Sequence, residues 1–274
     1  MHRGARTGGS PSLRPPGDAP TCIQVDYTAD MVEKRASSAR SRRFETARSR
    51  GIRLQAALHS DILSGRLRPG QSLSETKVAD QHGISRTPVR EVFQNLAKEG
   101  LLRVVPQIGT FVAPINLRSV NAAQFIREAL ECRAVRDAAK TVTRAQASAL
   151  RDQIARQAKA IREGDHRGFF ALDEAMHRTI LEISGHAGVW DLITAVKAQL
   201  DRVRYLSLED QAWLTMIFRQ HRAIVAAVVG QRPGAAEDAL QTHLRSVFAA
   251  VDRIAAANPE FFESDGGELR QESA

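Results

Sequence analysis

The stretch Ser74–Gly100, SETKVADQHGISRTPVREVFQNLAKEG, constrains the fold of this 274-residue chain more than any other. Apolar Val78 and Ala79 indicate a first short helix, and Gly83 permits a tight turn after it. A second helix is expected to begin at Ser85, because a serine hydroxyl can accept a hydrogen bond from the free backbone N–H groups at a helix start. The stretch therefore predicts a helix-turn-helix.

The predicted second helix has two different faces. Its inward face consists of Val89, Phe93 and Leu96. Its outward face consists of Arg86, Thr87 and Arg90, and Pro88 lies in the first turn, where its missing N–H is not needed. Two guanidiniums beside the partial positive charge of a helix N-terminus suit a DNA major groove. The alternative is a surface helix with solvated arginines.

The residues on either side of this stretch favour a DNA-binding helix over a solvated surface helix. Residues 101–115, LLRVVPQIGTFVAPI, look like two short strands around Pro106–Gly109, which would form the wing of a winged helix. Upstream, residues 53–64 carry apolar side chains at helical spacing and predict a scaffold helix. A turn at Leu67–Gly70 then leads into a short strand before Ser74.

The net charge of +8 is concentrated in the N-terminal half. Lys and Arg exceed Asp and Glu by five in residues 1–50 and by three in residues 51–115, whereas residues 116–274 are balanced. A basic half suits a polyanionic partner. Residues 1–50, rich in Arg, Ser, Pro, Gly and Ala, predict a disordered basic tail. The alternatives for it are a nonspecific DNA-binding arm, an uninvolved segment or a misassigned start codon.

Cysteine usage and hydropathy indicate a cytoplasmic protein. Two cysteines, Cys22 and Cys132, do not make a disulfide framework. No window is apolar enough for a membrane helix, and the start lacks the apolar core of a signal peptide.

The rest of the chain predicts an all-α bundle in residues 116–258, followed by a flexible tail in residues 259–274. Helical periodicity and turn signals place the helices at 117–142, 144–163, 165–184, 187–208, 211–230 and 233–257. The expected fold class is mainly α: an N-terminal winged helix-turn-helix with a small β wing in residues 51–115, and then the bundle.

Four residues of the bundle have metal-ligating chemistry. Asp173 and His177 lie one turn apart on one helix face, and His221 and His243 each lie on a core-facing apolar stripe. One carboxylate oxygen and three imidazole nitrogens suit Zn²⁺, Ni²⁺, Mn²⁺ or a similar divalent ion. On the residues alone, hydrogen-bonded core histidines are the more frequent outcome.

The run Ile62–Ile115, with "LSGRLRPGQSLSE", "GISRTPVRE", "LAKEGLL" and "GTFVAPI", closely resembles the DNA-binding domain of the GntR family of bacterial transcription regulators. In that family the counterparts of Arg86, Thr87 and Arg90 contact operator bases and phosphates. The wing glycine, here Gly109, lets the wing tip approach the minor groove. Thr76 stands where some members carry an arginine that touches DNA. The expected DNA-binding residues are Thr76, Ser85, Arg86, Thr87, Pro88, Arg90 and Gly109.

The length and helix order of the bundle resemble the FadR-type effector domain, called the FCD domain. That resemblance implies a metal site formed by Asp173, His177, His221 and His243, which fit the family's order of ligands. It also implies that Arg127, followed four residues later by Glu131, binds the carboxylate of an effector. From spacing alone these two would form an exposed ion pair. Arg204 and Arg202 are further effector-binding candidates, of which one is expected on the surface.

Three functions are compatible with these features. The first is a metabolite-responsive transcription regulator, a homodimeric repressor on a double-stranded DNA operator, whose operator affinity is controlled by a small organic acid bound beside a divalent metal ion. The second is a metal-dependent hydrolase that uses the Asp/His₃ site. No separate general base has convincing placement, and a winged helix is unusual in an enzyme. The third is a nonspecific DNA-compacting protein with a basic arm.

Overall fold

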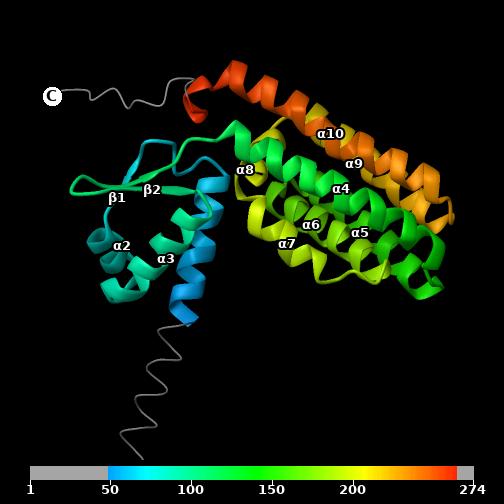
Figure 1. Ribbon diagram of the computed structural model, residues 1–274, viewed down its shortest axis with the longest axis horizontal. Coiled ribbons are helices and arrows are strands. Elements are labelled where there is room, and N and C mark those ends of the chain that lie inside the picture. Colours follow the sequence, from blue (N-terminus) through cyan, green and yellow to red (C-terminus); the bar gives the residue numbers. More distant parts are fainter. Residues whose placement is uncertain (1–48, 264–274) are drawn as a thin grey trace, which may run out of the picture. The chain divides into compact units, whose positions relative to one another are not determined.

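The computed structural model describes residues 49–263 (Figure 1). Residues 49–63 are helical and precede a small domain of two further helices and three strands. These elements are β1 (Ser72–Leu73), α2 (Glu75–His82), α3 (Arg86–Lys98), β2 (Leu102–Val105) and β3 (Gly109–Val112). The predicted helix-turn-helix and wing are therefore both present.

Local chemistry explains the turn between α2 and α3. The Ser74 side chain accepts a hydrogen bond from the backbone N–H of Lys77 and so caps α2. Gly83 ends α2 with a φ of 60°, a left-handed conformation that glycine adopts without steric cost. Ser85 stands at the first position before α3, but its side chain makes no capping hydrogen bond. The predicted capping role of Ser85 is therefore wrong, and its exposed hydroxyl stays on the surface.

The three strands form one antiparallel sheet in the order β1-β3-β2. Ser72 pairs with Phe111 of β3, and Val105 pairs with Gly109 across the hairpin that forms the wing. One core cluster holds this domain together, and the predicted inward face of α3 is buried in it. The buried residues of α2 and α3 are Val78, Ala79, Val89, Val92, Phe93 and Leu96.

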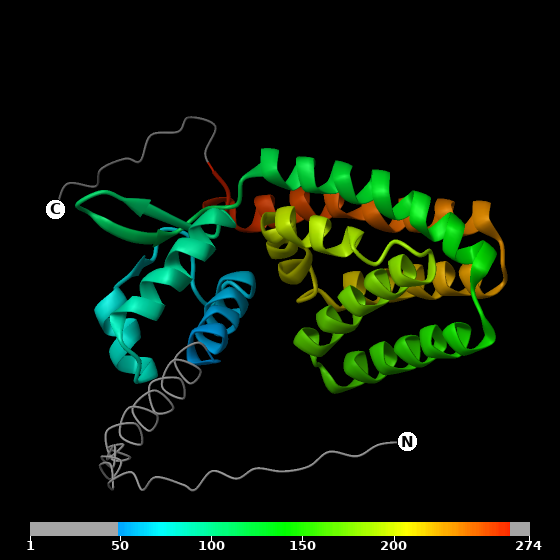
Figure 2. The ribbon, with the colours of Figure 1, turned by 60° about the horizontal axis from the view of Figure 1, so that its bottom comes forward.

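Seven helices follow and form the predicted all-α bundle. They are α4 (Leu117–Thr141), α5 (Arg144–Glu163), α6 (His166–Ile183), α7 (Val189–Val196), α8 (Ala198–Ser207), α9 (Gln211–Val229) and α10 (Pro233–Ala257). Figure 1 and Figure 2 both show α4 and α10 running side by side along the bundle. The main core lies among α4, α5, α6, α9 and α10, where their apolar faces meet.

The prediction of one helix over residues 187–208 is wrong. The helix breaks at Lys197, whose φ of −92° and ψ of 1° separate α7 from α8. No glycine or proline marks the break in the sequence. The buried Lys197 ammonium instead bonds with the carboxylates of Glu174 on α6 and Asp201 on α8. The contact with Glu174 on another helix is tertiary, and hydrophobic periodicity does not report it.

The prediction of a flexible tail is wrong for residues 259–263. Pro259–Phe261 form a short 3₁₀ helix, and Phe261 is buried in a core cluster with residues of α4, α8 and α10. Ile115 pairs with Phe262, and the Asn116 side chain donates a hydrogen bond to Glu263 at 2.5 Å. Residues 259–263 therefore belong to the folded part. The remainder of the predicted tails, residues 1–48 and 264–274, lies outside the described residues.

Within residues 49–263, no helix combines the length and the apolar character needed to cross a membrane.

Candidate DNA-binding surface and metal centre

The predicted DNA-binding residues lie on the surface of the small domain. Arg86, Thr87 and Arg90 are exposed on the N-terminal half of α3. Thr76 is exposed on α2, and Gly109 is exposed where the wing hairpin turns back. Pro88 is half-buried in the first turn of α3. The structure thus keeps the cationic face of α3 free of the domain core.

Glu75 is a residue of this surface that sequence reasoning missed. Both oxygens of its carboxylate accept hydrogen bonds from Arg90 at 3.1 Å, and Arg86 lies 3.4 Å from it. The hydrogen bonds from Arg90 lower the pKa of Glu75, so the carboxylate is charged at neutral pH. Glu75 therefore holds the two guanidiniums together in the absence of DNA. The only sequence signal for it is its position at the start of the neighbouring helix.

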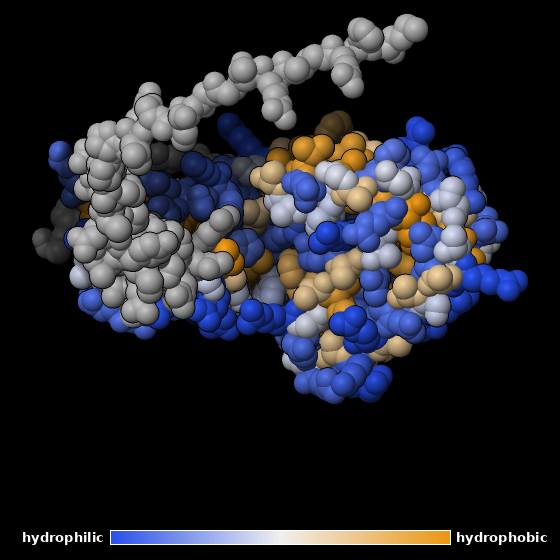
Figure 3. Space-filling view, turned by 90° about the horizontal axis from the view of Figure 1, so that it is seen from below, coloured by the Kyte–Doolittle hydropathy of each residue, from blue (hydrophilic) through white to orange (hydrophobic). Residues whose placement is uncertain are grey.

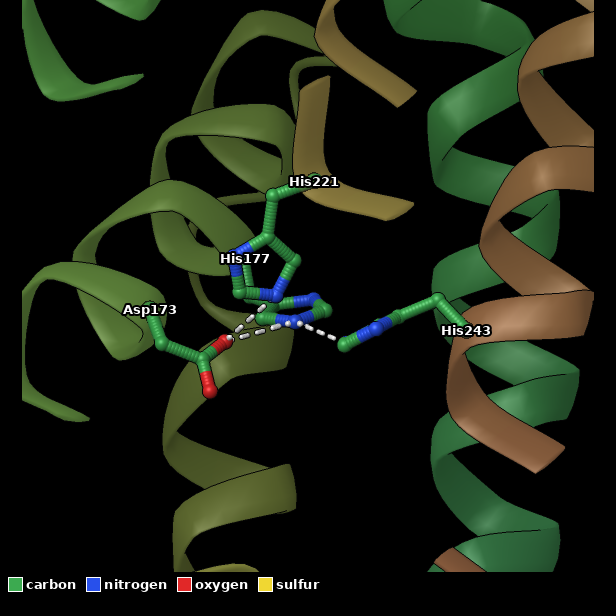
Figure 4. Close-up of side chains that lie close together, drawn as sticks. All are labelled: Asp173, His177, His221 and His243. Atoms are coloured by element: carbon green, nitrogen blue, oxygen red, sulfur yellow. Dashed lines mark hydrogen bonds and ion pairs between the residues drawn. The ribbon is translucent and has the colours of Figure 1, made fainter. Parts of the chain in front are cut away.

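The four predicted metal ligands converge at one buried point (Figure 4). Asp173 and His177 come from α6, His221 comes from α9 and His243 comes from α10. One potential ligand atom from each lies within 4.8 Å of all the others. The prediction that these side chains come together is confirmed at the level of geometry.

The spacing and the unpaired atoms at this point fit a divalent metal ion. His177 Nε2 lies 3.2 Å from His243 Nε2 and 3.1 Å from Asp173 Oδ1. Two ligand atoms bound about 2.0–2.1 Å from a tetrahedral Zn²⁺ would be separated by roughly 3.3 Å. Asp173 Oδ1 and His221 Nε2 have no hydrogen-bond partner in the protein although they are buried. Buried atoms without a partner are costly unless a bound group satisfies them.

Each of the four candidate ligands is hydrogen-bonded to a second polar side chain on the side away from the cluster. Glu131 Oε2 lies 2.6 Å from His177 Nδ1, Gln157 Oε1 lies 2.8 Å from His221 Nδ1, and Gln220 Oε1 lies 3.1 Å from His243 Nδ1. Arg204 donates to Asp173 Oδ2 at 2.8 Å. Bonds at the outer nitrogens leave the inner Nε2 atoms as lone-pair donors. Sequence reasoning missed the roles of Glu131, Gln157 and Gln220, because they lie far along the chain from the ligands they orient.

The protonation states of the four clustered side chains favour binding of a cation. Burial lowers the pKa of His221 to about 4 and that of His243 well below its usual value, so both rings are neutral at pH 7. Burial alone would raise the pKa of Asp173, but the charge of the Arg204 guanidinium outweighs it and keeps this carboxylate ionised. Burial also opposes charge on His177, yet Glu131 raises its pKa, so a proton competes for this ring. The set is anionic and rich in nitrogen lone pairs.

Arg127 and Glu131 form a buried pair, not the exposed pair that spacing alone suggests. Arg127 Nε donates to Glu131 Oε1 at 2.6 Å, and both side chains are 2% exposed. Burial alone would raise the pKa of Glu131, but Arg127 and His177 together lower it to about 2. Arg127 is thus linked to His177, a candidate metal ligand, through Glu131.

Arg202 of α8 is buried and Arg204 is largely covered, so the expectation of one surface arginine is wrong. Arg202 is 0% exposed and donates to the Ala113 carbonyl at 2.7 Å. The Arg204 side chain is 10% exposed and bonds with carboxylates of Asp173, Glu174 and Asp201. These three carboxylates therefore use most of the hydrogen-bond donors of the Arg204 guanidinium.

A small cavity of about 30 Å³ adjoins the cluster. Asp173 and His243 form one side of it, and Arg127 and Arg204 also line it. Its other lining residues are Gln124, Ser207, Leu208, Trp213, Ile217, Leu244, Ser246, Val247 and Ala250. This volume admits only one or two water-sized groups. A larger molecule would have to move the walls apart.

Comparisons with known proteins place these two parts in one family. Residues 52–112 match the model of "Bacterial regulatory proteins, gntR family", and residues 124–246 match the FCD domain. An HTH-type transcriptional regulator of Streptomyces ambofaciens is 40% identical over 76% of this chain and 87% of its own. The chain belongs to the GntR family of bacterial transcription regulators.

Two other known proteins are similar to this chain, one in sequence and one in fold. The HTH-type transcriptional repressor RspR of Escherichia coli K12 is 35% identical, over 76% of this chain and 91% of its own. The structure of Escherichia coli McbR/YncC is similar in fold, with a TM-score of 0.64 and 21% identity over 74% of this chain and 97% of its own. GntR-family regulators bind DNA and are not enzymes, so the hydrolase alternative is set aside.

Proposed function

We propose that this GntR-family protein is a repressor whose operator affinity is controlled by a small carboxylate bound beside a divalent metal ion. The observation that carries the proposal is the placement of α8, which contacts both the metal cluster and the DNA-binding domain. Arg204 of α8 bonds with the ligand Asp173, and Gln199 of the same helix donates to the Gly100 carbonyl directly after α3. The name of the relative RspR, a repressor, supports the sense of regulation.

Arg86, Thr87 and Arg90 are proposed to read the operator, with Thr76, Ser85, Pro88 and Gly109 contributing phosphate or wing contacts. Exposure of the α3 face supports this assignment. Arginine suits it because its guanidinium can donate two parallel hydrogen bonds to a guanine edge. The Glu75 carboxylate must give up at least part of its hold on Arg90 when a base is bound. DNA binding also places the protein with the chromosome in the bacterial cytoplasm.

Asp173, His177, His221 and His243 are proposed to hold the ion, with Zn²⁺, Ni²⁺ and Mn²⁺ as the candidates. A bound divalent ion would supply positive charge for a carboxylate of the effector. Arg127 lines the same cavity and can add a second cationic contact, since guanidinium and carboxylate groups match in geometry. Arg204 is the weaker effector contact because three carboxylates already bind it.

Movement of the cavity walls would link effector binding to the affinity of the protein for DNA. Because the cavity holds only about 30 Å³, an organic acid can be admitted only if its walls move. One of these walls is the end of α8, through Arg204 and Ser207. The start of α8 packs into the core of the DNA-binding domain through Ala198. Displacing α8 would therefore disturb the support of the reading helix.

A second copy of the chain is proposed to pack on the face formed by α4 and α10. Phe125 is 75% exposed and Phe248 is 46% exposed, and both line a groove between these helices. Exposed apolar residues along one groove favour burial against another protein surface. Two linked winged helices could then read the two halves of a near-palindromic operator.

The DNA assignment predicts selective loss of operator binding. Arg86→Ala and Arg90→Ala should each weaken binding to an operator, selected by the wild-type protein from random duplexes, by about 5- to 150-fold, because a bidentate contact contributes roughly 1–3 kcal/mol. Binding is measured by fluorescence anisotropy at fixed salt. Metal content and oligomeric state should not change.

Arg178→Ala is the matched control, because Arg178 is an exposed arginine of α6 whose guanidinium pairs with Glu182 on the same helix. It should bind the operator as the wild type does. Equal affinities of the wild type and both α3 variants would contradict the assignment. The same assay, repeated with organic acids and with the metal removed by a chelator, tests effector control.

A further inference from the structure

Gln124 is the most unusual polar residue of the cavity. It lies on α4 and is 2% exposed, yet neither its Nε2 nor its Oε1 has a hydrogen-bond partner in the protein. A buried amide without hydrogen-bond partners lowers the stability of the folded protein. A molecule bound beside it would supply those partners. Gln124 lines the cavity next to the metal cluster, so a bound molecule can reach it.

Gln124 and Arg127 lie on the same face of α4. Residues three apart on a helix are neighbours, and their separation along the axis is about 4.5 Å. A molecule whose carboxylate binds at Arg127 and the metal cluster would therefore have a group three or four atoms further on beside Gln124. This places Gln124 at the far end of the effector.

The hydrogen-bonding capacity around Gln124 selects the chemistry of that group. The amide offers both a donor and an acceptor. Ser207 and Ser246 also line the cavity, and each donates its own proton to a backbone carbonyl, of Arg204 at 2.7 Å and of His243 at 2.6 Å. Their hydroxyl oxygens can therefore still accept. A hydroxyl group of the effector can both donate to these acceptors and accept from the amide, whereas a second carboxylate can only accept.

We propose that Gln124 is the specificity-determining residue of the effector site and that the effector is a hydroxylated monocarboxylic acid. The proposal rests on the proposed effector function of the same cavity. Trp213, Leu244 and Val247 supply apolar walls for the carbon chain. The hydroxyl that binds Gln124 lies at least two carbons from the carboxylate, which distinguishes this class from plain fatty acids and dicarboxylates.

The test compares pairs of acids that differ only in hydroxyl groups. Binding of glycerate and propionate, and of gluconate and hexanoate, is measured by isothermal calorimetry on the full-length, metal-loaded protein, with succinate as the dicarboxylate. We expect the wild type to prefer the hydroxylated member of at least one pair. Gln124→Met should weaken binding of that acid by about 5- to 100-fold, because the methionine has similar length but no amide. Binding of the plain acids should change less than about twofold.

The matched control is Gln153→Met, the same change at a half-buried glutamine of α5 that bonds to Thr179 and lines neither the effector cavity nor the groove between α4 and α10. It should keep the preference of the wild type. A second readout is the thermal unfolding midpoint without effector. A purely structural glutamine would lower this midpoint when replaced, whereas Gln124→Met should leave it unchanged or raise it.

The outcomes separate the two proposals. If no acid binds to the wild-type protein, the proposed effector function fails, and this inference fails with it. If acids bind but Gln124→Met keeps the preference for hydroxyl groups, or if succinate binds best, only the role of Gln124 is overturned.

Discussion

At the scale of single residues, the largest predicted effect belongs to Glu131, whose contact with His177 sequence reasoning missed. Glu131→Gln would leave the buried Arg127 charge without its carboxylate and would weaken the hold on His177. We expect unfolding by urea to show a loss of about 3–5 kcal/mol, because breaking one partner of a buried ion pair leaves an uncompensated charge. Metal affinity, from competition with a chelator, should fall about 10- to 100-fold.

Glu182→Gln is the control for this change, since Glu182 pairs with Arg178 four residues away on the exposed face of α6 and should contribute less than about 1 kcal/mol. The sign of the pH dependence of the stability that Glu131 contributes follows from its pKa shift. The pKa of Glu131 falls from 4.5 to about 2 on folding, so its stabilisation is complete above pH 4.5 and is lost as the pH falls towards 2. A stability curve without this acid loss would contradict the pairing.

Cys132 provides a second prediction at the residue scale. Burial, together with Glu128 and Glu131, raises the pKa of its thiol from 9.0 to about 12. Because the thiolate is the reactive form, alkylation by iodoacetamide at pH 8 should be about a thousand times slower than for a free thiol. The rate should rise about tenfold per pH unit below pH 12. Mass spectrometry of the Cys132 peptide measures it, and the urea-unfolded chain, in which the thiol should react at the ordinary rate, is the control.

At the scale of elements, α8 is predicted to transmit the effector signal. Gln199→Leu removes the hydrogen bonds of this side chain to the Gly100 carbonyl, the Asn116 N–H and Arg202, but leaves Arg204 and the metal cluster intact. An effector commonly changes the affinity of a regulator for its second ligand by about 5- to 150-fold. In the Gln199 variant, the ratio of operator affinities without and with effector should fall towards one. Fluorescence anisotropy with and without effector measures the ratio.

Gln153→Leu is a matched control for α8, because it breaks a hydrogen bond to Thr179 between α5 and α6, within the bundle. That variant should keep the response. If the Gln199 variant responds as strongly as the wild type, α8 does not carry the signal through this contact.

At the scale of the whole molecule, the face of α4 and α10 is predicted to join two copies. Placing a charge in the groove with Phe125→Asp should convert the dimer into a monomer, because burying an unpaired carboxylate is unfavourable. Light scattering after gel filtration should then show half the mass. Operator affinity should fall as well, since a monomer contacts one half-site.

Other apolar residues are exposed on the bundle and provide the control for the dimer face. Leu192 is 64% exposed on α7, and Figure 3 shows that apolar patches also occur on the face seen from below. Leu192→Asp should leave the mass unchanged. A monomeric Leu192 variant together with a dimeric Phe125 variant would place the interface elsewhere.

Features that depend on neighbours along the chain were predictable from the amino-acid sequence. Helix positions, the turn at Gly83, the inward face of α3 and the pairing of Asp173 with His177 on one side of α6 all follow from short-range spacing. The convergence of His221 and His243 on that pair was expected through the family resemblance, because periodicity alone places them only on core-facing stripes.

Features that depend on distant segments came from the tertiary structure. Glu131 and His177 are 46 residues apart, and Gln157 and His221 are 64 apart, so no local pattern reveals that one orients the other. The helix break at Lys197 and the unpartnered amide of Gln124 likewise arise from packing between elements. Short-range spacing encodes which face of a helix is apolar, but the partner of a buried polar group is set only when the helices pack.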